Sequence, residues 1–181
     1  MTISPEESRA SVWVQRFAGL IPAAGEVLDL ACGTGRHARF LAGLGYRVEA
    51  VDRDSQALVS LHGFGRVSAR RADLEAGAWP YDGQSFAGIV VSNYLFRPRL
   101  DELLACLADP GVLIYETFMI GNERHGRPSN PEFLLRSQEL LGRVQQRGWR
   151  VLAFEEGEIE RPRPAIVQRL CAARGAIAGR L

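Results

Sequence analysis

The stretch Asp29-Leu30-Ala31-Cys32-Gly33-Thr34-Gly35 decides the fold of this chain. It follows a short apolar run over residues 26–30 and precedes a predicted helix over residues 36–44, whose apolar side chains share one face. Glycines at 33 and 35 let the backbone turn sharply and approach a ligand closely, because no Cβ intervenes. The helix start behind them offers unpaired N–H groups to a carboxylate or phosphate. The stretch therefore predicts a nucleotide-binding loop between a strand and a helix.

The same strand and helix unit recurs along the chain. Residues 46–52 alternate in polarity and end in Asp52, and a helix over residues 56–61 follows, capped by Asp54 or Ser55. The next predicted elements are strands over residues 67–71, 86–92 and 112–118 and a helix over residues 100–107. Strands that alternate with helices predict an α/β fold with a doubly wound, mostly parallel, Rossmann-like sheet.

The end of the chain departs from this alternation. A helix is predicted over residues 131–146, followed by strands over 150–159 and 165–172. Only residues 160–164 join these two strands, so the strands are predicted to form a β-hairpin. The sheet is then seven-stranded and ends in an antiparallel pair.

One domain is expected over residues 1–181. Ser4-Pro5-Glu6-Glu7 is typical of a helix start, so residues 1–24 are interpreted as an N-terminal helix or lid that runs through Trp13 and Phe17. Residues 25–118 form the cofactor-binding core. Residues 119–181 supply a substrate loop, a helix and the hairpin.

Composition narrows the possible partners and locations. The net charge is +1 and no basic stripe stands out, so no nucleic-acid partner is expected. The 3 cysteines are widely spaced, which is typical of a reduced compartment. No signal peptide is evident and no apolar run approaches the length of a membrane span. A cytoplasmic monomer or homodimer without membrane association is therefore expected.

Two ligand classes share the geometry of the loop. Residues 33–38 also fit the GxGxxA pattern of dinucleotide-binding proteins. The discriminating residue is Asp29, because a carboxylate there suits a ligand with an ammonium group and repels a pyrophosphate. Asp52 lies 23 positions after Asp29 and can accept both hydroxyls of a ribose. An NAD(P)-binding oxidoreductase and a non-catalytic binding subunit stay open as alternatives.

The motifs, taken in order, resemble those of the class I S-adenosylmethionine-dependent methyltransferases. Residues 27–35 resemble their first motif, residues 48–52 the second, residues 72–74 the third and residues 90–95 the fourth. The resemblance covers about residues 25–120. Residues 33–46 are also similar to the tellurite-resistance-type group of small methyltransferases.

This resemblance implies S-adenosyl-L-methionine as cofactor and assigns roles to individual residues. Asp29 would bind the ammonium group and Asp52 the ribose, while Asp73 and Leu74 would bind the adenine. The implied cofactor-binding residues are Asp29, Ala31, Gly33, Gly35, Asp52, Arg53, Asp73, Leu74 and Ser92. One departure is Ala31, where many relatives carry glycine, and only a slight change of backbone path is expected there. Plainer roles also fit: Asp29 could cap the helix that follows, and Asp52 could be a turn acid.

The acceptor side is expected at the fourth motif and in the polar loop after the fifth strand. Asn93, Tyr94 and His125 are the candidate catalytic residues, and Glu116, Arg124 and Arg127 are the candidate substrate-binding residues. Asn93-Tyr94 replaces an Asn-Pro-Pro-Tyr type tetrad, which disfavours methylation of DNA bases. The loop's charges could instead pair with one another. The histidines lack the spacing of a metal site, so no metal is expected.

No residue stands out as a dedicated general base. This favours a small-molecule methyl acceptor with a soft or already ionised nucleophile, such as a thiol, a chalcogen oxyanion or another small nucleophile.

Overall fold

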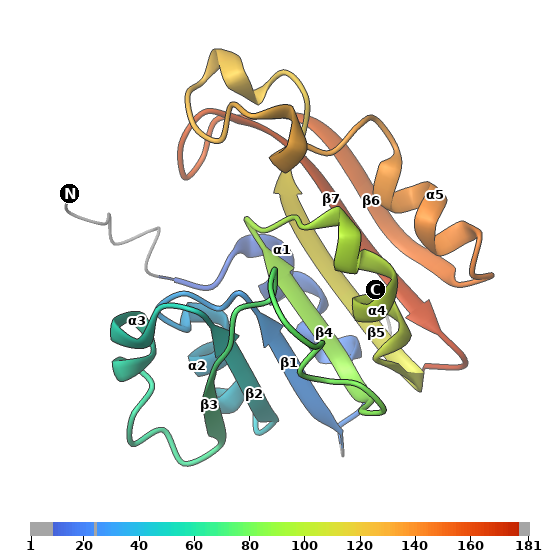
Figure 1. Cartoon of the computed structure of the whole chain (residues 1–181). Coiled ribbons are helices and arrows are strands. Elements are labelled where there is room, and N and C mark those ends of the chain that lie inside the picture. The colour runs from blue at the N-terminus through green and yellow to red at the C-terminus, as the bar shows by residue number, and fades with distance from the viewer. Residues whose placement is uncertain (1–8, 24, 178–181) are drawn as a thin grey trace.

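The computed structural model of the chain describes residues 9–23 and 25–177, which form a seven-stranded sheet with helices on both faces (Figure 1). The strands are β1 (Glu26–Leu30), β2 (Arg47–Asp52), β3 (Val67–Arg71), β4 (Phe86–Ser92), β5 (Leu107–Phe118), β6 (Arg150–Ile159) and β7 (Ala165–Arg174). They are ordered β3-β2-β1-β4-β5-β7-β6. The pairs from β3 to β5 are parallel, whereas β7 is antiparallel to both β5 and β6. The predicted doubly wound, mostly parallel sheet with a C-terminal hairpin is confirmed.

Short helices cover the sheet on two sides (Figure 1). The α-helices in the described part of the chain are α1 (Val12–Phe17), α2 (Arg36–Gly43), α3 (Ser55–Val59), α4 (Leu100–Ala105) and α5 (Glu139–Gln145). The 3-10 turns are η1 (Ala18–Leu20), η2 (Arg97–Arg99), η3 (Asn122–Arg124) and η4 (Pro131–Phe133). Within residues 9–23 and 25–177, no helix combines the length and the apolar character that crossing a bilayer would need.

Successive strand residues point to opposite faces, so the sheet separates two apolar layers. Leu28 and Leu30 of β1 pack in the layer with α4 and α5, and Val27 packs in the layer with α1, α2 and α3. In β4, Ile89 and Val90 divide between the layers in the same way. Both layers are buried, which is why these strands are apolar on both faces.

The N-terminal helix is shorter than the sequence predicts. Its expected start at residues 4–7 lies outside the described residues. Within them, α1 begins only at Val12, because Ser11 is extended and its hydroxyl accepts a hydrogen bond from the Val14 N–H at 3.1 Å. The Ser11 N–H donates to Nε2 of His37 at 3.2 Å, which holds the backbone out of the helix at this point.

The prediction of a single helix over residues 131–146 is wrong. The chain forms only η4, then becomes extended at Leu134, and α5 begins at Glu139. Leu135 pairs with Met119 as an isolated bridge, so the segment adds backbone pairing to the end of β5. The Arg97 side chain donates to the Leu134 carbonyl at 2.6 Å and stabilises the extended path.

The boundary between α4 and β5 also differs from the prediction. The helix predicted to end at residue 107 ends at Ala105, and β5 begins at Leu107 instead of Val112. The extra strand residues pair Leu107 with Phe86 across a register shift, which lengthens β5 toward its start.

Candidate active site

The site lies where the crossover direction of the sheet reverses. β1 pairs in parallel with β2 on one side and with β4 on the other, and ligands of open α/β sheets bind beyond the carboxyl ends of such strands. The loop after β1 bends through left-handed backbone at Ala31 (φ 52°), Gly33 (φ 54°) and Gly35 (φ 73°). A Cβ at Gly35 would lie 2.3 Å from Leu61 Cδ2, so only glycine fits there. Ala31 takes a conformation that glycine adopts more easily.

Asp29 ends β1 beneath this loop and is 1% exposed. Its Oδ2 accepts a hydrogen bond from the Ala38 N–H at 2.8 Å, so it ties the loop to the first turn of α2. Burial raises the pKa of the Asp29 carboxyl to about 7, although this hydrogen bond and nearby Arg36 act to lower it. A cation placed beside Asp29 would favour the ionised form.

Asp52 ends the neighbouring strand and also contacts the loop. Its Oδ2 accepts from the Gly33 N–H at 2.8 Å and its Oδ1 from the Asp54 N–H at 2.9 Å. Asp73, after β3, is exposed and accepts from the Glu75 N–H at 2.9 Å. The three acids therefore lie at or just beyond the ends of successive strands β1, β2 and β3, as the motif order predicts. Each of them already accepts a hydrogen bond from a backbone N–H.

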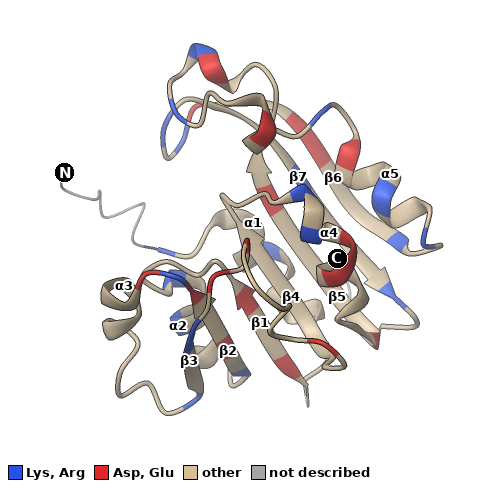
Figure 2. Cartoon of the chain, viewed as in Figure 1, with Lys and Arg blue, Asp and Glu red and all other residues tan. Residues whose placement is uncertain are grey.

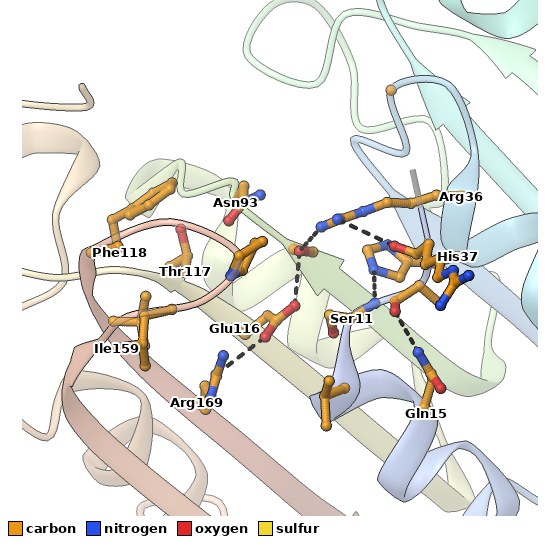
Figure 3. A pocket seen from close by; sticks show the side chains of 18 of the residues that line it. Ser11, Gln15, Arg36, His37, Asn93, Glu116, Thr117, Phe118, Ile159 and Arg169 are labelled. Carbon is orange, nitrogen blue, oxygen red and sulfur yellow. Dashed lines mark hydrogen bonds and ion pairs between the residues drawn. The ribbon is translucent and has the colours of Figure 1, made fainter. Parts of the chain in front are cut away.

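A row of polar side chains crosses the sheet beside the loop. Ser92, Glu116, Arg169 and Glu155 are successive register partners on β4, β5, β7 and β6, so their side chains are neighbours. The Ser92 hydroxyl donates to Glu116 Oε1 at 3.1 Å, and Arg169 Nε lies 3.3 Å from Glu116 Oε2. Arg36 of α2 donates to Ser92 Oγ at 3.2 Å, which links this row of side chains to the start of α2 (Figure 3).

The opposite wall is the segment that leads into α1. His37 is 3% exposed, and burial lowers its pKa to about 3, so the imidazole is neutral at physiological pH. Its Nε2 can then accept the Ser11 N–H. In Figure 3 Ser11 and Gln15 face the same hollow as His37, which places the N-terminal segment over the helix start.

These elements enclose one cavity of about 770 Å³, within the range of small-molecule sites. One end is the β1 loop with Asp29. The other end is formed by the last residues of β5 and by the β6–β7 hairpin, where Phe118 and Ile159 point inward (Figure 3). Glu116 lies between the two ends and is 7% exposed.

Residues 27–109 match the methyltransferase domain family. This match includes the loop after β1 that forms one end of the cavity. Over these residues the chain carries a methyltransferase domain of the class I S-adenosylmethionine-dependent type. The cofactor is therefore S-adenosyl-L-methionine, and the dinucleotide and non-catalytic readings of the loop are set aside.

Solved structures share the fold of this methyltransferase at low sequence identity. TehB from Haemophilus influenzae has a TM-score of 0.70 and 20% identity over 90% of this chain, which spans 61% of TehB. A protein of Listeria monocytogenes described as an S-adenosylmethionine dependent methyltransferase has a TM-score of 0.68 and 15% identity, covering 91% of this chain and 98% of its own. The glycopeptide N-methyltransferase MtfA, solved with S-adenosyl-L-homocysteine, has a TM-score of 0.62 and 19% identity, covering 89% and 88%. A search of curated protein sequences finds no match.

The structure brings part of the predicted set to the cavity of the methyltransferase. The predicted residues that line it are Asp29, Ala31, Gly33, Ser92, Asn93 and Glu116. The predicted residues outside its lining are Gly35, Asp52, Arg53, Asp73, Leu74, Tyr94, Arg124, His125 and Arg127. Of the second group, Leu74 packs in the core layer that contains α4 and α5.

Asn93 and Tyr94 leave the end of β4 in different directions. Asn93 adopts φ 57°, donates its N–H to the Glu116 carbonyl at 3.0 Å and lines the cavity. The Tyr94 ring instead packs beside Leu30 and Trp79, and its buried hydroxyl has no hydrogen-bond partner among the described residues. Burial raises the pKa of Tyr94, so its phenol stays protonated at neutral pH. The side chain does not line the cavity.

The loop after β5 does not bring its basic residues to the cavity. His125 Nε2 lies 3.1 Å from Glu158 on β6, and Arg124 Nε donates to the Gly121 carbonyl at 3.2 Å. Asn122 explains this path, because it is buried and accepts the Ile166 N–H of β7 at 3.0 Å. The structure therefore does not bring the predicted catalytic residue His125 to the cavity. The predicted substrate-binding residues Arg124 and Arg127 also lie outside its lining.

Basic residues that the sequence analysis did not single out line the cavity instead. They are Arg9, Arg36, Arg161, Arg163 and Arg169. The signal for Arg36 was available, since it opens the helix after the glycine loop. No local signal marked Arg169, which reaches the site only through the register of β7 on β5. Across residues 9–23 and 25–177, no three His, Cys, Asp or Glu side chains gather as a metal ion would need.

Proposed function

We propose that this methyltransferase transfers the methyl group of S-adenosylmethionine to a small molecule held in the cavity between the β1 loop and the β6–β7 hairpin. The carrying observation is the cavity itself, about 770 Å³ and continuous from Asp29 to the hairpin. The segment before α1 lines one side of this cavity, and a cavity of this volume suits a small acceptor better than a protein or nucleic-acid strand.

The cofactor's amino-acid part is proposed to occupy the β1 end. Asp29 would pair with its ammonium group, and backbone N–H groups of the loop would face its polar atoms. Asp52 would accept the ribose hydroxyls beside the Gly33 N–H that it already binds. Asp73 would meet the adenine at the end of the next strand.

When bound, S-adenosylmethionine supplies an electrophilic methyl group on a sulfonium sulfur. The loop after β1, with Asp29, would hold the cofactor, and an acceptor at the hairpin end would present its nucleophile to this methyl group. Ser92, Asn93 and Glu116 would line the path between the two partners and restrict their orientation. Excluding water from this path favours transfer to the bound acceptor.

The chemistry of the lining favours an acceptor that needs little help in losing a proton. Of the described lining residues that could take one, His37 already accepts a hydrogen bond at Nε2 and has a pKa lowered by burial to about 3. Glu116 is engaged with Ser92 and Arg169. A thiolate, a chalcogen oxyanion or another ionised nucleophile is therefore the proposed acceptor.

A labelled-methyl assay tests this proposal. The purified chain would be incubated with methyl-labelled S-adenosylmethionine and separate pools of small thiols, chalcogen oxyanions, amines and carboxylic acids, with protein and nucleic-acid pools alongside. Label in low-mass product from the thiol or oxyanion pools is expected. Label that enters only the macromolecular pools, or only the amine pool, would contradict the proposed acceptor.

A further inference from the structure

The hairpin end of the cavity combines an apolar wall with positive charge. Phe118 ends β5, Ile159 ends β6 and Val167 lies near the start of β7, and all three line the cavity. Figure 3 shows Phe118 and Ile159 on the side of the hollow opposite Arg36 and His37. This wall consists of one aromatic ring and two branched aliphatic side chains, so it can contact the apolar part of a small ligand, called its apolar body below.

The charge of the lining is unbalanced. Among the described residues that line the cavity, five are arginines and two, Asp29 and Glu116, are acids. Arg169 is already paired with Glu116 and Glu155.

Two of the lining arginines, both on the hairpin, take part in neither of these pairs. Arg161 and Arg163 lie in the loop between β6 and β7, whose tip is basic in Figure 2. Neither makes an ion pair within the described part of the chain, and the Arg163 guanidinium lies 5.7 Å from the centre of the Phe118 ring. Two guanidinium groups at one rim, beside an aromatic face, form a suitable receptor for a planar anionic group.

We propose that the acceptor is a small organic anion, with its oxyanion group at Arg161 and Arg163 and its apolar body against Phe118, Ile159 and Val167. This inference rests on the proposed small-molecule function and names its substrate class. The anionic group sits at the rim, and the body extends inward toward Glu116, which places the nucleophile at the inner end.

The cofactor's own carboxylate is a different candidate for this basic rim. The cofactor loop is at the β1 end, and Arg36 at the start of α2 is the basic residue beside it. Arg161 and Arg163 enter from the hairpin at the other end of the cavity. Their removal is therefore expected to leave cofactor affinity unchanged.

Calorimetry on the full chain saturated with S-adenosylhomocysteine tests the inference. Three probes separate its parts: phenylacetate carries both the body and the charge, phenylacetamide only the body, and sulfate only the charge. Phenylacetate is expected to bind about tenfold more tightly than either of the others. In the double variant Arg161→Gln, Arg163→Gln this advantage over phenylacetamide should disappear, while S-adenosylhomocysteine still binds with wild-type affinity.

The matched control is Arg66→Gln, an exposed arginine that donates to the Gly45 carbonyl and lies outside the cavity lining. It should bind all three probes as the wild type does. The inference is overturned if phenylacetate does not bind, if phenylacetamide or sulfate equals it, or if its advantage survives in the double variant. Loss of S-adenosylhomocysteine binding in the double variant would also overturn it, because the rim would then belong to the cofactor.

The proposed function fails on a different readout. If phenylacetate binds as expected but the labelled-methyl assay marks no small molecule, the anion site stands and small-molecule transfer does not. If small neutral thiols are labelled but phenylacetate binds no more tightly than phenylacetamide, small-molecule transfer stands and the anion site does not.

Discussion

Asp29 is the residue at which the proposed cofactor contact and proton binding would compete. Burial raises the pKa of its carboxyl to about 7, and the cofactor's ammonium group would stabilise the ionised form. S-adenosylhomocysteine affinity should therefore rise up to about tenfold between pH 6 and pH 8, as the carboxyl ionises. Asp29→Asn should bind more weakly at pH 8 and show little of this rise. Calorimetry at several pH values measures both.

Stability gives an independent check on the same residue. An acid whose folded-state pKa lies above its unfolded value, near 4, destabilises the fold once it ionises. The free energy of unfolding without cofactor should thus fall as pH rises from about 4 through 7, and this component should be missing in Asp29→Asn. The asparagine keeps an acceptor for the Ala38 N–H, so the helix start is preserved. Identical pH profiles for the two proteins, in binding and in unfolding, would rule out this account of Asp29.

Residues whose role is local could be predicted from the sequence. Gly33 and Gly35 were assigned to a tight loop from their spacing alone, and both have positive φ. Asp29 was given two readings, helix cap and ligand site, and the structure shows the cap while leaving the side chain at the cavity. The position of His125 could not be predicted locally, because its partner Glu158 lies on a strand far along the chain.

At the scale of elements, Arg97 holds the irregular segment between β5 and α5. Its guanidinium donates to Glu139 Oε1 and Oε2, each at 2.8 Å, and to the carbonyls of Glu132 and Leu134. Arg97→Met would leave a largely buried carboxylate and two carbonyls without this donor. We expect a loss of about 2–4 kcal/mol in unfolding free energy. Urea denaturation followed by circular dichroism measures it.

Arg143→Met is the matched control for this loss. Arg143 lies on α5 and approaches Asp101 at 3.5 Å, a pair in which the Asp101 side chain is 66% exposed. Such pairs contribute less than about 1 kcal/mol. If the two variants lose similar stability, the contacts of Arg97 are not what fixes the extended segment.

This segment also shows why some elements could not be predicted. Strands β1 and β4 are short and largely apolar on both faces, whereas β2 alternates in polarity, and the pattern gives the bounds of all three to within one residue. Leu134, Leu135 and Leu140 have spacing that also fits a helix. The chain becomes extended there because Leu135 pairs with Met119 and Arg97 binds the carbonyl before it, and neither contact is visible in a local window.

At the scale of the molecule, the site depends on strand register. Ser92, Glu116 and Arg169 come from three strands and become neighbours only when β4, β5 and β7 are aligned. The proposed cofactor half of the site lies close together in the sequence around the first loop, so sequence motifs predict it. The proposed acceptor half is assembled from β5 and the hairpin, and a motif cannot report that assembly.

The charge balance of this assembly leads to a prediction about ligand discrimination. Glu116 is a buried acid amid the cavity's arginines, and S-adenosylmethionine carries a positive sulfonium where S-adenosylhomocysteine is neutral. Glu116→Gln removes one negative charge from a partly desolvated site, so the cavity repels the cation more. The ratio of the two dissociation constants, S-adenosylmethionine over S-adenosylhomocysteine, should rise about three- to tenfold. Paired calorimetric titrations at low salt measure this ratio.

Glu155→Gln makes the same charge change on the same row and serves as the control. Glu155 approaches Arg169 at 3.7 Å, but its side chain is 51% exposed and does not line the cavity. Solvent screens its field, so the ratio should stay near the wild-type value. If Glu155→Gln shifts the ratio as far as Glu116→Gln does, net charge rather than position governs the discrimination. If Glu116→Gln weakens both ligands equally, Glu116 shapes the site without acting on the sulfonium charge.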